Sequence, residues 1–213
     1  MKRKKIIGIF CNGEKINKKI FSLFSNEINF IICADGGSDK IHHLNIVPDV
    51  IIGDMDSISN KALMKFKKSR IISINNQNST DLEKALQFAT KMKPDKIYLF
   101  GAMGNRIDHT LTNLNLMKKY YRYSDIVFIS NKSKLIYTDK PIKLYEKIGT
   151  TISLIPLGKV SKVSLNGFLY PLNYEDLEFG RRDGQSNLSI SNEQIIDFKK
   201  GDLFIVINFK KND

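Results

Sequence analysis

The sequence predicts an α/β protein: an N-terminal, mainly parallel sheet with flanking helices, followed by a C-terminal antiparallel β-sandwich. Up to about residue 130, short apolar runs alternate with amphipathic segments, as in sheets covered by helices. From about Ser133 the helical pattern stops, and short strand-like pieces separated by glycines follow. We therefore expect two domains, residues 1–131 and residues 132–213.

Each element of the first domain follows from local composition. Apolar runs rich in β-branched and aromatic residues predict strands near residues 5–11, 29–34, 49–53, 70–74, 96–101 and 125–130. Apolar positions at helical spacing predict helices near residues 14–25, 38–44, 59–67, 80–92 and 109–121. Pro48 and Pro94 fall in loops just before strands, where they remove no ladder hydrogen bond.

The second domain reads as strands and turns. Strand-like pieces are expected at residues 135–137, 151–156, 162–165, 185–191 and 203–208. Glycines between them supply turns, which favours an antiparallel sandwich or barrel.

Composition limits the class of protein. The 213 residues are 42% hydrophobic, enough for one large core or two small ones, and no apolar run reaches the roughly 18 residues of a membrane span. The basic N-terminus resembles a signal-peptide start, but its apolar part ends at Cys11 without a cleavage site, so we expect a first strand. Cys11 and Cys33 form no CxxC motif, which indicates reduced thiols in a cytoplasmic protein.

The formal net charge of +12 raises the alternative of a nucleic-acid-binding protein. Such a protein gathers basic residues on one face or interleaves them with aromatic residues. Here the excess is mostly lysine, spread over predicted helices, turns and both termini. We therefore expect no nucleic-acid partner and no membrane partner, although the positive field could steer an anionic small molecule.

The clearest chemical signal is a pair of carboxylates after a buried strand. Asp54 and Asp56 follow the apolar run 50–53, and in an extended backbone residues i and i+2 point to the same side. Two carboxylates held close repel one another unless a cation lies between them. Mg²⁺ suits such a site, because it takes carboxylate oxygens together with water and phosphate oxygens. Solvated or helix-capping aspartates are the alternative.

Other strand ends carry related groups. Asp35 follows the strand 29–34, and Gly36 and Gly37 come next, before a helix whose N-terminus favours a phosphate. An Asx turn would explain Asp35 without any ligand. The segment 101–109 follows another apolar strand and contains Arg106. Since ligands of open α/β sheets bind at the carboxyl ends of strands, these groups are expected to converge.

Four blocks in this order resemble the thiamine pyrophosphokinase (thiamin diphosphokinase) family. They are CADGGSDKIHHLNIVPDVIIGDMDSIS at 33–59, STDLEKAL at 79–86, GAMGNRIDHTLTN at 101–113 and GFLYPLNYEDLEFGRRDGQSN at 167–187, with the strand-like GDLFIVI after them. The resemblance covers nearly the whole chain. It implies a kinase that transfers pyrophosphate from ATP to the hydroxyl of thiamine, giving thiamine diphosphate and AMP. It also implies an α/β catalytic domain, a β-sandwich that helps to hold thiamine, and a homodimer with its active site at the subunit interface.

The resemblance assigns roles to individual residues. The implied catalytic residues are Asp54, Asp56, Asp81 and Arg106, and the implied Mg²⁺ ligands are Asp54, Asp56 and Asp81. The implied ATP and phosphate contacts are Asp35, Gly36, Gly37, Gln77, Thr80, Lys84, Arg106 and Asp108. The implied thiamine contacts are Ser186 and Asn187.

Structural explanations stay open for several of these residues. Thr80 and Glu83 fit a capping box, and Asp81 in the first helical turn complements the macrodipole. Arg106 suits bidentate phosphate binding but could be a surface residue, and Asp108 could cap a helix. The chain also departs from the family pattern at Asn78, Ala102 and Asn105.

Two rival functions remain at this stage. A pyrophosphokinase for another heterocyclic alcohol, such as a hydroxymethylpterin, would keep the acidic first domain and change the tail. A basic module that binds a nucleotide or nucleic acid without catalysis is disfavoured, because acidic strand ends repel a phosphate backbone.

Overall fold

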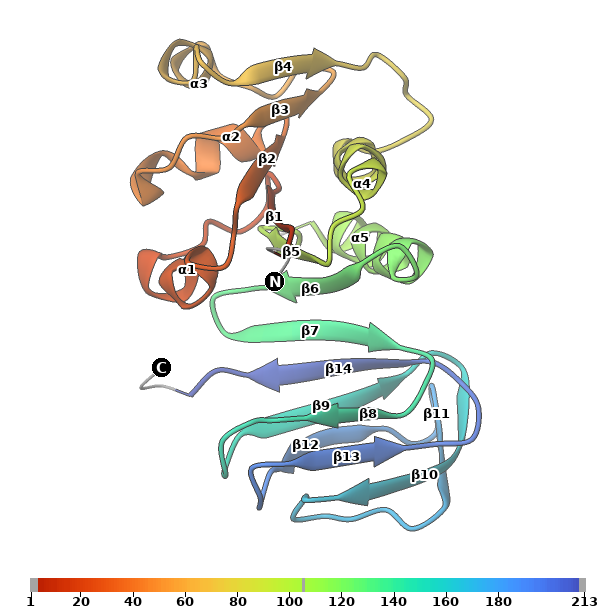
Figure 1. The fold of residues 1–213 in the computed structure, drawn as a ribbon. Coiled ribbons are helices and arrows are strands. Elements are labelled where there is room, and N and C mark those ends of the chain that lie inside the picture. The colour runs from red at the N-terminus through yellow and green to blue at the C-terminus, as the bar shows by residue number, and fades with distance from the viewer. Residues whose placement is uncertain (1–3, 105, 211–213) are drawn as a thin grey trace. The chain divides into compact units, whose positions relative to one another are not determined.

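A computed structural model describes residues 4–104 and 106–210 of the chain. The chain divides into two compact units, with the boundary between Asn131 and Lys132 (Figure 1). Both units contain buried hydrophobic residues.

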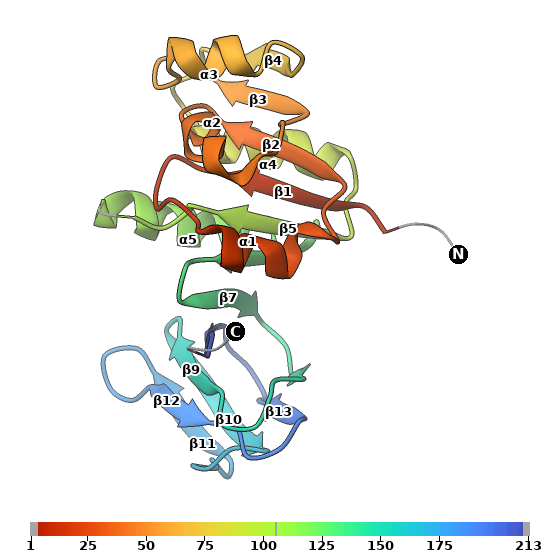
Figure 2. The same ribbon diagram turned by 90° about the vertical axis from the view of Figure 1, so that its left-hand side faces the viewer.

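The first unit is built on a parallel sheet with the strand order β6-β5-β1-β2-β3-β4. Its strands are β1 (Ile6–Phe10), β2 (Phe30–Ala34), β3 (Val50–Gly53), β4 (Arg70–Ser73), β5 (Lys96–Phe100) and β6 (Asp125–Ile129). Its helices are α1 (Lys18–Ser25), α2 (Gly37–Lys40), the short 3₁₀ helix η1 (His42–Leu44), α3 (Asn60–Lys65), α4 (Asp81–Lys91) and α5 (Ile107–Tyr120). Helices α1 and α2 lie on one face of the sheet, and α4 and α5 lie on the other (Figures 1 and 2).

Burial on both faces explains the composition of the central strands. All residues of β1 and β3 are buried, and these strands are continuous β-branched and apolar runs instead of alternating ones. Helix α4 packs against β2 and β3 through apolar residues that include Leu82, Ala85 and Leu86. This packing brings the N-terminus of α4 to the sheet edge where β2 and β3 end.

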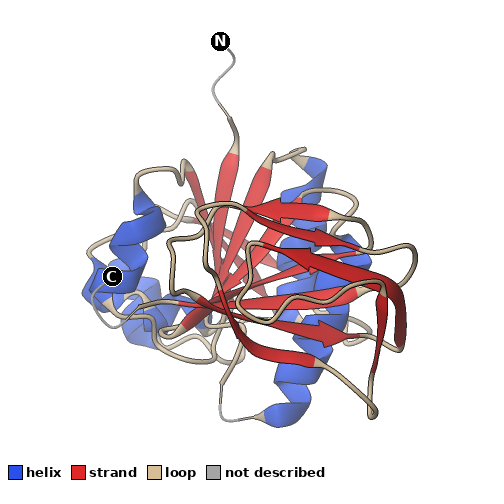
Figure 3. Ribbon diagram, turned by 90° about the horizontal axis from the view of Figure 1, so that it is seen from below, coloured by secondary structure: helices blue, strands red, loops and turns tan. Residues whose placement is uncertain are grey.

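The second unit consists of antiparallel strands in two sheets, coloured red in Figure 3. One sheet has the order β12-β9-β14-β7 and the other β11-β10-β13-β8. The strands are β7 (Ser133–Thr138), β8 (Ile142–Leu144), β9 (Thr151–Pro156), β10 (Lys159–Asn166), β11 (Glu175–Glu178), β12 (Gly184–Leu188), β13 (Gln194–Asp197) and β14 (Leu203–Asn208). Side chains from both sheets, among them Leu154, Val160, Ile196 and Ile205, form one hydrophobic core.

The predicted fold class is confirmed, and the differences concern individual elements. The expected helix 38–44 is instead two short pieces, α2 and η1, and Asn45 ends the second in a left-handed conformation with φ 57°. Strands β8, β11 and β13 were not predicted. They are three or four residues long, and β11 (EDLE) is mostly charged, so no apolar alternation marked it. In the described residues, no helix is long and apolar enough to cross a membrane.

Candidate metal and phosphate site

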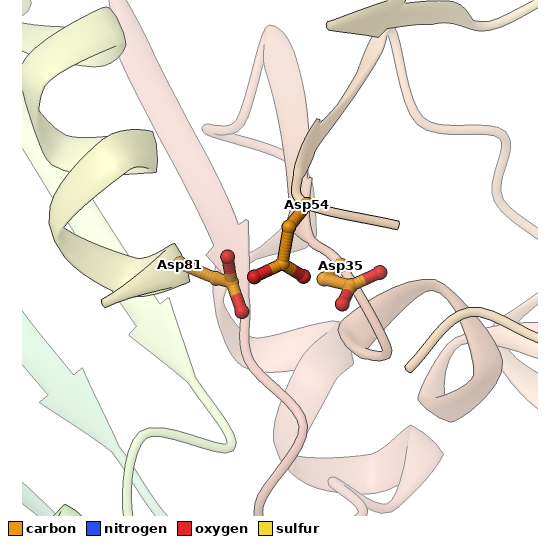
Figure 4. A group of neighbouring side chains, drawn as sticks. All are labelled: Asp35, Asp54 and Asp81. Carbon is orange, nitrogen blue, oxygen red and sulfur yellow. The ribbon is translucent and has the colours of Figure 1, made fainter. Parts of the chain in front are cut away.

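Three aspartates from separate elements converge at the carboxyl edge of the parallel sheet. Asp35 follows β2, Asp54 follows β3 and Asp81 opens α4. One carboxylate oxygen from each lies within 4.8 Å of the others (Figure 4). The register Cys33↔Ile51 aligns the neighbouring strands β2 and β3, so their ends lie side by side.

Asp35 is the most deeply buried member of this cluster. Only 1% of the residue is exposed, and its backbone has φ 41°, which follows from the sharp turn between β2 and α2. Its Oδ2 accepts a hydrogen bond of 3.0 Å from the backbone N–H of Ser57. Its Oδ1 has no hydrogen-bond partner among the described residues. A buried carboxylate oxygen without a partner is costly, so it indicates that a ligand belongs there.

The backbone after β3 corrects one step of the sequence interpretation. Strand β3 ends at Gly53, and Met55 has φ 70°, so residues 54–56 are not extended. Asp56 is exposed and outside the three-carboxylate group, and its Oδ1 accepts a hydrogen bond of 2.8 Å from Ser57 Oγ. The three-carboxylate group thus contains Asp35, and the predicted role of Asp56 as a metal ligand stays a prediction.

Thr80 caps α4, so Asp81 is the first residue of the helix. This start of the helix places the Asp81 carboxylate in the cluster. The Thr80 side chain accepts a hydrogen bond of 3.2 Å from the Glu83 N–H, which confirms Thr80 as the N-cap. The reciprocal half of the predicted capping box was wrong. The Glu83 carboxylate instead accepts hydrogen bonds from Lys119 at 2.6 Å and Tyr120 at 3.1 Å, which tie α4 to α5.

Lys84 lies beside the cluster and is almost fully buried. Its side chain is 2% exposed, and Nζ lies 2.9 Å from Asp81 Oδ1 and 3.6 Å from Asp54 Oδ2. One turn of α4 thus carries an acid and a base that contact each other.

Gly53 allows Asp35 and Asp81 to lie close together. The sequence analysis predicted no role for this glycine. A Cβ added there would lie 2.7 Å from Asp35 Cβ and 3.1 Å from Asp81 Oδ1. Any larger residue would push the carboxylates apart. The signal was present in the sequence, because a glycine directly before Asp54 interrupts a β-branched run.

Gly36 and Gly37 also allow close packing, Gly37 against backbone and Gly36 against a side chain. A Cβ at Gly37 would lie 2.1 Å from the Phe10 carbonyl oxygen, and one at Gly36 would meet the Asn12 side chain. Contact between the end of β1 and the start of α2 therefore accounts for these glycines without a phosphate. Their predicted role in phosphate binding stays a prediction.

The local electrostatics follow from burial and crowded negative charge. Burial raises the pKa of Asp35 to about 6, with a further contribution from the Asp81 and Asp56 charges and an opposing one from the Ser57 hydrogen bond. Burial also acts to raise the pKa of Asp54, but the Asp56 N–H and Lys84 outweigh it, so that this pKa is lowered. The pKa of Lys84 is raised, because its hydrogen bond to Asp81 and the nearby negative charges exceed the effect of burial.

The donor set fits a hard divalent cation. Three carboxylates from rigid strand ends and a helix N-terminus offer oxygen ligands, which Mg²⁺ prefers to nitrogen or sulfur. The unpartnered Asp35 Oδ1 supports the same interpretation.

Arg106 and Asp108 lie at the start of α5. Both are exposed, and Arg106 binds Asp108 with two hydrogen bonds, one of them 3.1 Å from Nε to Oδ1. The Arg106 hydrogen bond lowers the pKa of Asp108 to about 2. Ala102 is buried in the loop after β5, and Asn105 lies outside the described residues.

Gln77 and Asn78 are exposed in the loop between β4 and α4. The Asn78 N–H donates to the Asn76 side chain at 2.8 Å, so this loop forms a local turn. No contact in the described residues links Gln77 to the aspartate cluster.

In the second unit, Ser186 and Asn187 lie on β12 and differ in exposure. Ser186 is exposed with φ 59°. Asn187 is 6% exposed, and its amide group donates to the Tyr170 carbonyl at 2.6 Å and accepts from the Tyr170 N–H at 3.0 Å. Asn187 thus fastens the segment around Tyr170 to β12.

Comparison with known proteins identifies the family. The family model described as "Thiamin pyrophosphokinase, catalytic domain" matches residues 21–129, about half of the chain. The chain belongs to the thiamin pyrophosphokinase family. A second model, "Thiamin pyrophosphokinase, vitamin B1 binding domain", matches residues 139–203. The resemblance predicted from the sequence blocks is therefore confirmed.

Individual relatives span nearly the same length. Thiamine pyrophosphokinase of Bacillus subtilis is 29% identical over 214 aligned residues, covering 95% of this chain and 98% of the relative. Thiamine pyrophosphokinase 1 of Arabidopsis thaliana is 30% identical, covering 84% and 78%. The crystal structure of the Bacillus subtilis enzyme superposes with a TM-score of 0.87 at 27% identity, covering 97% of this chain and 100% of that chain. Yeast thiamin pyrophosphokinase, at 17% identity, shares the fold with a TM-score of 0.85, covering 98% and 87%.

Proposed function

We propose that this protein transfers a diphosphoryl group from ATP to the hydroxyl of thiamine. The thiamine oxygen forms a bond to the β-phosphorus of ATP, the bond from the bridging oxygen to that phosphorus breaks, and AMP leaves. The hydroxyl proton goes to solvent or to a nearby base. The observation that carries the proposal is the convergence of Asp35, Asp54 and Asp81 at the carboxyl edge of the sheet, in a chain of this family.

The proposed metal ligands are Asp35, Asp54 and Asp81, with Mg²⁺ as the ion. Bound Mg²⁺ supplies neutralisation of the negative charge on ATP phosphates. The protein contributes the rigid placement of its ligands, since each carboxylate extends from the end of a strand or the first turn of a helix. Asp56, which contributes to the raised pKa of Asp35, is proposed as an additional ligand of the ion or of its bound water.

Arg106 is the proposed phosphate clamp. Its guanidinium is exposed and carries a permanent charge, and Asp108 orients it through two hydrogen bonds. Thr80 and Gln77 flank the N-terminal end of α4 and are proposed to contribute polar contacts to ATP. A phosphate contact from Gly36 and Gly37 remains a proposal from the family pattern, because both residues are buried and pack against the segment at the end of β1.

The proposed roles of the two units rest on the two family models that match them. We propose that residues 1–131 bind ATP and Mg²⁺ and that residues 132–213 bind thiamine. Ser186 is exposed and can donate to, or accept from, the edge of a heteroaromatic ring. Asn187 is proposed to act mainly by holding the Tyr170 segment, because its amide already has backbone partners.

The proposed assembly is a homodimer, and the proposed location is the cytoplasm. A homodimer is what family membership implies, and mixing two inactive variants with exchange of subunits tests it. Asp54→Asn mixed with Ser186→Ala/Asn187→Ala regains part of the activity only if two chains build one site. For the location, the free, buried thiols of Cys11 and Cys33 accord with a reducing compartment.

The test of the activity is to incubate the purified protein with ATP, Mg²⁺ and thiamine and to separate the nucleotides by chromatography. We expect AMP and thiamine diphosphate in equal amounts, both dependent on thiamine. A hydroxymethylpterin in place of thiamine is the matched substrate control. Formation of ADP with thiamine monophosphate, or preference for the pterin, would contradict the proposal.

A further inference from the structure

We infer that Lys84 is a built-in counter-charge of the metal site, which offsets the repulsion between Asp54 and Asp81 while no cation is bound, and not a ligand of the ATP phosphates. This inference rests on the proposed function, because it concerns the same aspartate cluster. Nothing in the family assignment distinguishes the two roles of a lysine at this place.

Burial is the first observation. The Lys84 side chain is only 2% exposed, although lysine is among the residues least often buried. A lysine that binds a nucleotide phosphate needs its ammonium open to the incoming ligand. Arg106, with a side chain 68% exposed, has that property and Lys84 does not.

The contacts of the ammonium are the second observation. Nζ lies 2.9 Å from Asp81 Oδ1 and 3.6 Å from Asp54 Oδ2, so it bridges carboxylates from two different elements. A buried ammonium is tolerated only when it is paired, and here both partners belong to the cluster. Lys84 therefore fixes α4 to the end of β3 at the point where metal ligands are needed.

The charge balance is the third observation. With all four groups charged, Asp35, Asp54, Asp81 and Lys84 sum to a net charge of minus two, and the nearby Asp56 makes the site more negative still, which favours a divalent cation. Without the ammonium, three carboxylates would face one another with nothing to offset their repulsion. Removing it should make the free protein less stable and make a divalent cation bind more tightly.

The experiment compares Lys84→Met with the wild type, with Lys119→Met as the matched control. Lys119 also contacts a glutamate of α4, but its side chain is 61% exposed and its partner is Glu83, outside the cluster. Mn²⁺ binding is measured by calorimetry, thermal unfolding is followed in chelator and in Mg²⁺, and kcat and KM for ATP are determined.

The expected result for Lys84→Met has three parts. Mn²⁺ affinity rises by about tenfold, because a like charge close to the ion is gone. The unfolding temperature falls in chelator and recovers in Mg²⁺ by more than the wild type gains. KM for ATP changes by less than about threefold, while Lys119→Met leaves Mn²⁺ affinity and KM unchanged and shifts the unfolding temperature equally in chelator and in Mg²⁺.

Two results would overturn the inference. A KM for ATP raised tenfold or more with unaltered Mn²⁺ affinity would make Lys84 a phosphate ligand. Unchanged or weaker Mn²⁺ binding would show that its charge does not balance the cluster.

If Lys84→Met does not fold, Lys84→Gln, which keeps a hydrogen-bond donor for Asp81, is judged by the same criteria. Failure of the wild type to form AMP would refute the proposed function instead, since Mn²⁺ binding is measured without ATP.

Discussion

At the scale of single residues, the site depends on three aspartates, and only some of them are marked by a local sequence pattern. Asp54 and Asp81 could be predicted from their places after a strand and at the start of a helix. The presence of Asp35 and not Asp56 in the three-carboxylate group could not, because it follows from the left-handed backbone at Met55 and from the adjacency of β2 and β3. A single sequence encodes neither feature as a local pattern.

Gly53→Ala should damage the metal site more than the fold. The added Cβ would lie 2.7 Å from Asp35 Cβ, so the carboxylate must move, and we expect Mg²⁺ affinity to fall about tenfold or more. Overpacking should also lower the free energy of unfolding by about 1–3 kcal/mol. Mg²⁺ titration and urea unfolding measure the two effects.

The control for that variant is Gly8→Ala in strand β1 of the same sheet. Its Cβ would lie 3.2 Å from Ile28 Cδ1, the far end of a flexible side chain. We expect a smaller stability change and an unaltered Mg²⁺ midpoint. An equal loss of Mg²⁺ affinity in both variants would refute a specific role for Gly53.

The two cysteines should be inert in the folded protein. Burial raises the pKa of Cys11 to about 12 and raises the pKa of Cys33 well above its usual value. In the unfolded chain, thiols ionise near pH 8.5. Above about pH 8.5 the thiols can ionise in the unfolded chain but not in the folded protein. The free energy of unfolding is therefore unaffected by these thiols below about pH 8.5 and falls as the pH rises towards 12.

A thiol-specific disulfide reagent at pH 8 measures this difference. The native protein should react slowly, and protein in concentrated urea should react at once with both thiols. Rapid modification of one thiol under native conditions would show that Cys11 or Cys33 is accessible.

At the scale of elements, α4 is the helix that links folding to the site. Its cap, its first-turn aspartate and its apolar face were all readable from the segment 80–92. The Glu83 contacts with Lys119 and Tyr120 were not, because those residues come from α5, more than thirty positions along the chain. Contacts with α5 therefore decide whether the Glu83 side chain caps its own helix or binds a neighbouring one.

Thr80→Ala should lower both stability and metal binding. Loss of the cap on α4 is expected to reduce the free energy of unfolding by about 1 kcal/mol and to loosen Asp81, weakening Mg²⁺ binding several-fold. Asn17→Ala is the matched control, since the Asn17 side chain caps α1 by accepting a hydrogen bond of 2.8 Å from the Ile20 N–H. The control should lose similar stability and keep its Mg²⁺ affinity, whereas equal Mg²⁺ effects would contradict the account.

At the scale of the whole molecule, the change of pattern near residue 130 was enough to predict an α/β unit followed by antiparallel strands. Fold class followed from the long apolar runs of β1, β3 and β5 and from the turn glycines of the second unit. The polar strand β11 escaped prediction because three of its four residues are acidic and only Leu177 is buried, so pairing with β10 and not an apolar pattern defines the strand. The scattered lysines that give the net charge of +12 indicated no site.

The measurement that tests the central claim most directly is Mg²⁺ dependence of thiamine-dependent AMP formation in the wild type and in Asp35→Asn. The wild type, freed of metal by a chelator, should be inactive and should regain full activity as Mg²⁺ is added. Asp35→Asn should need at least about tenfold more Mg²⁺ and reach a turnover lower by about a hundredfold, because a ligand is lost. Full activity in excess chelator, or the same Mg²⁺ midpoint and turnover in both proteins, would contradict the account.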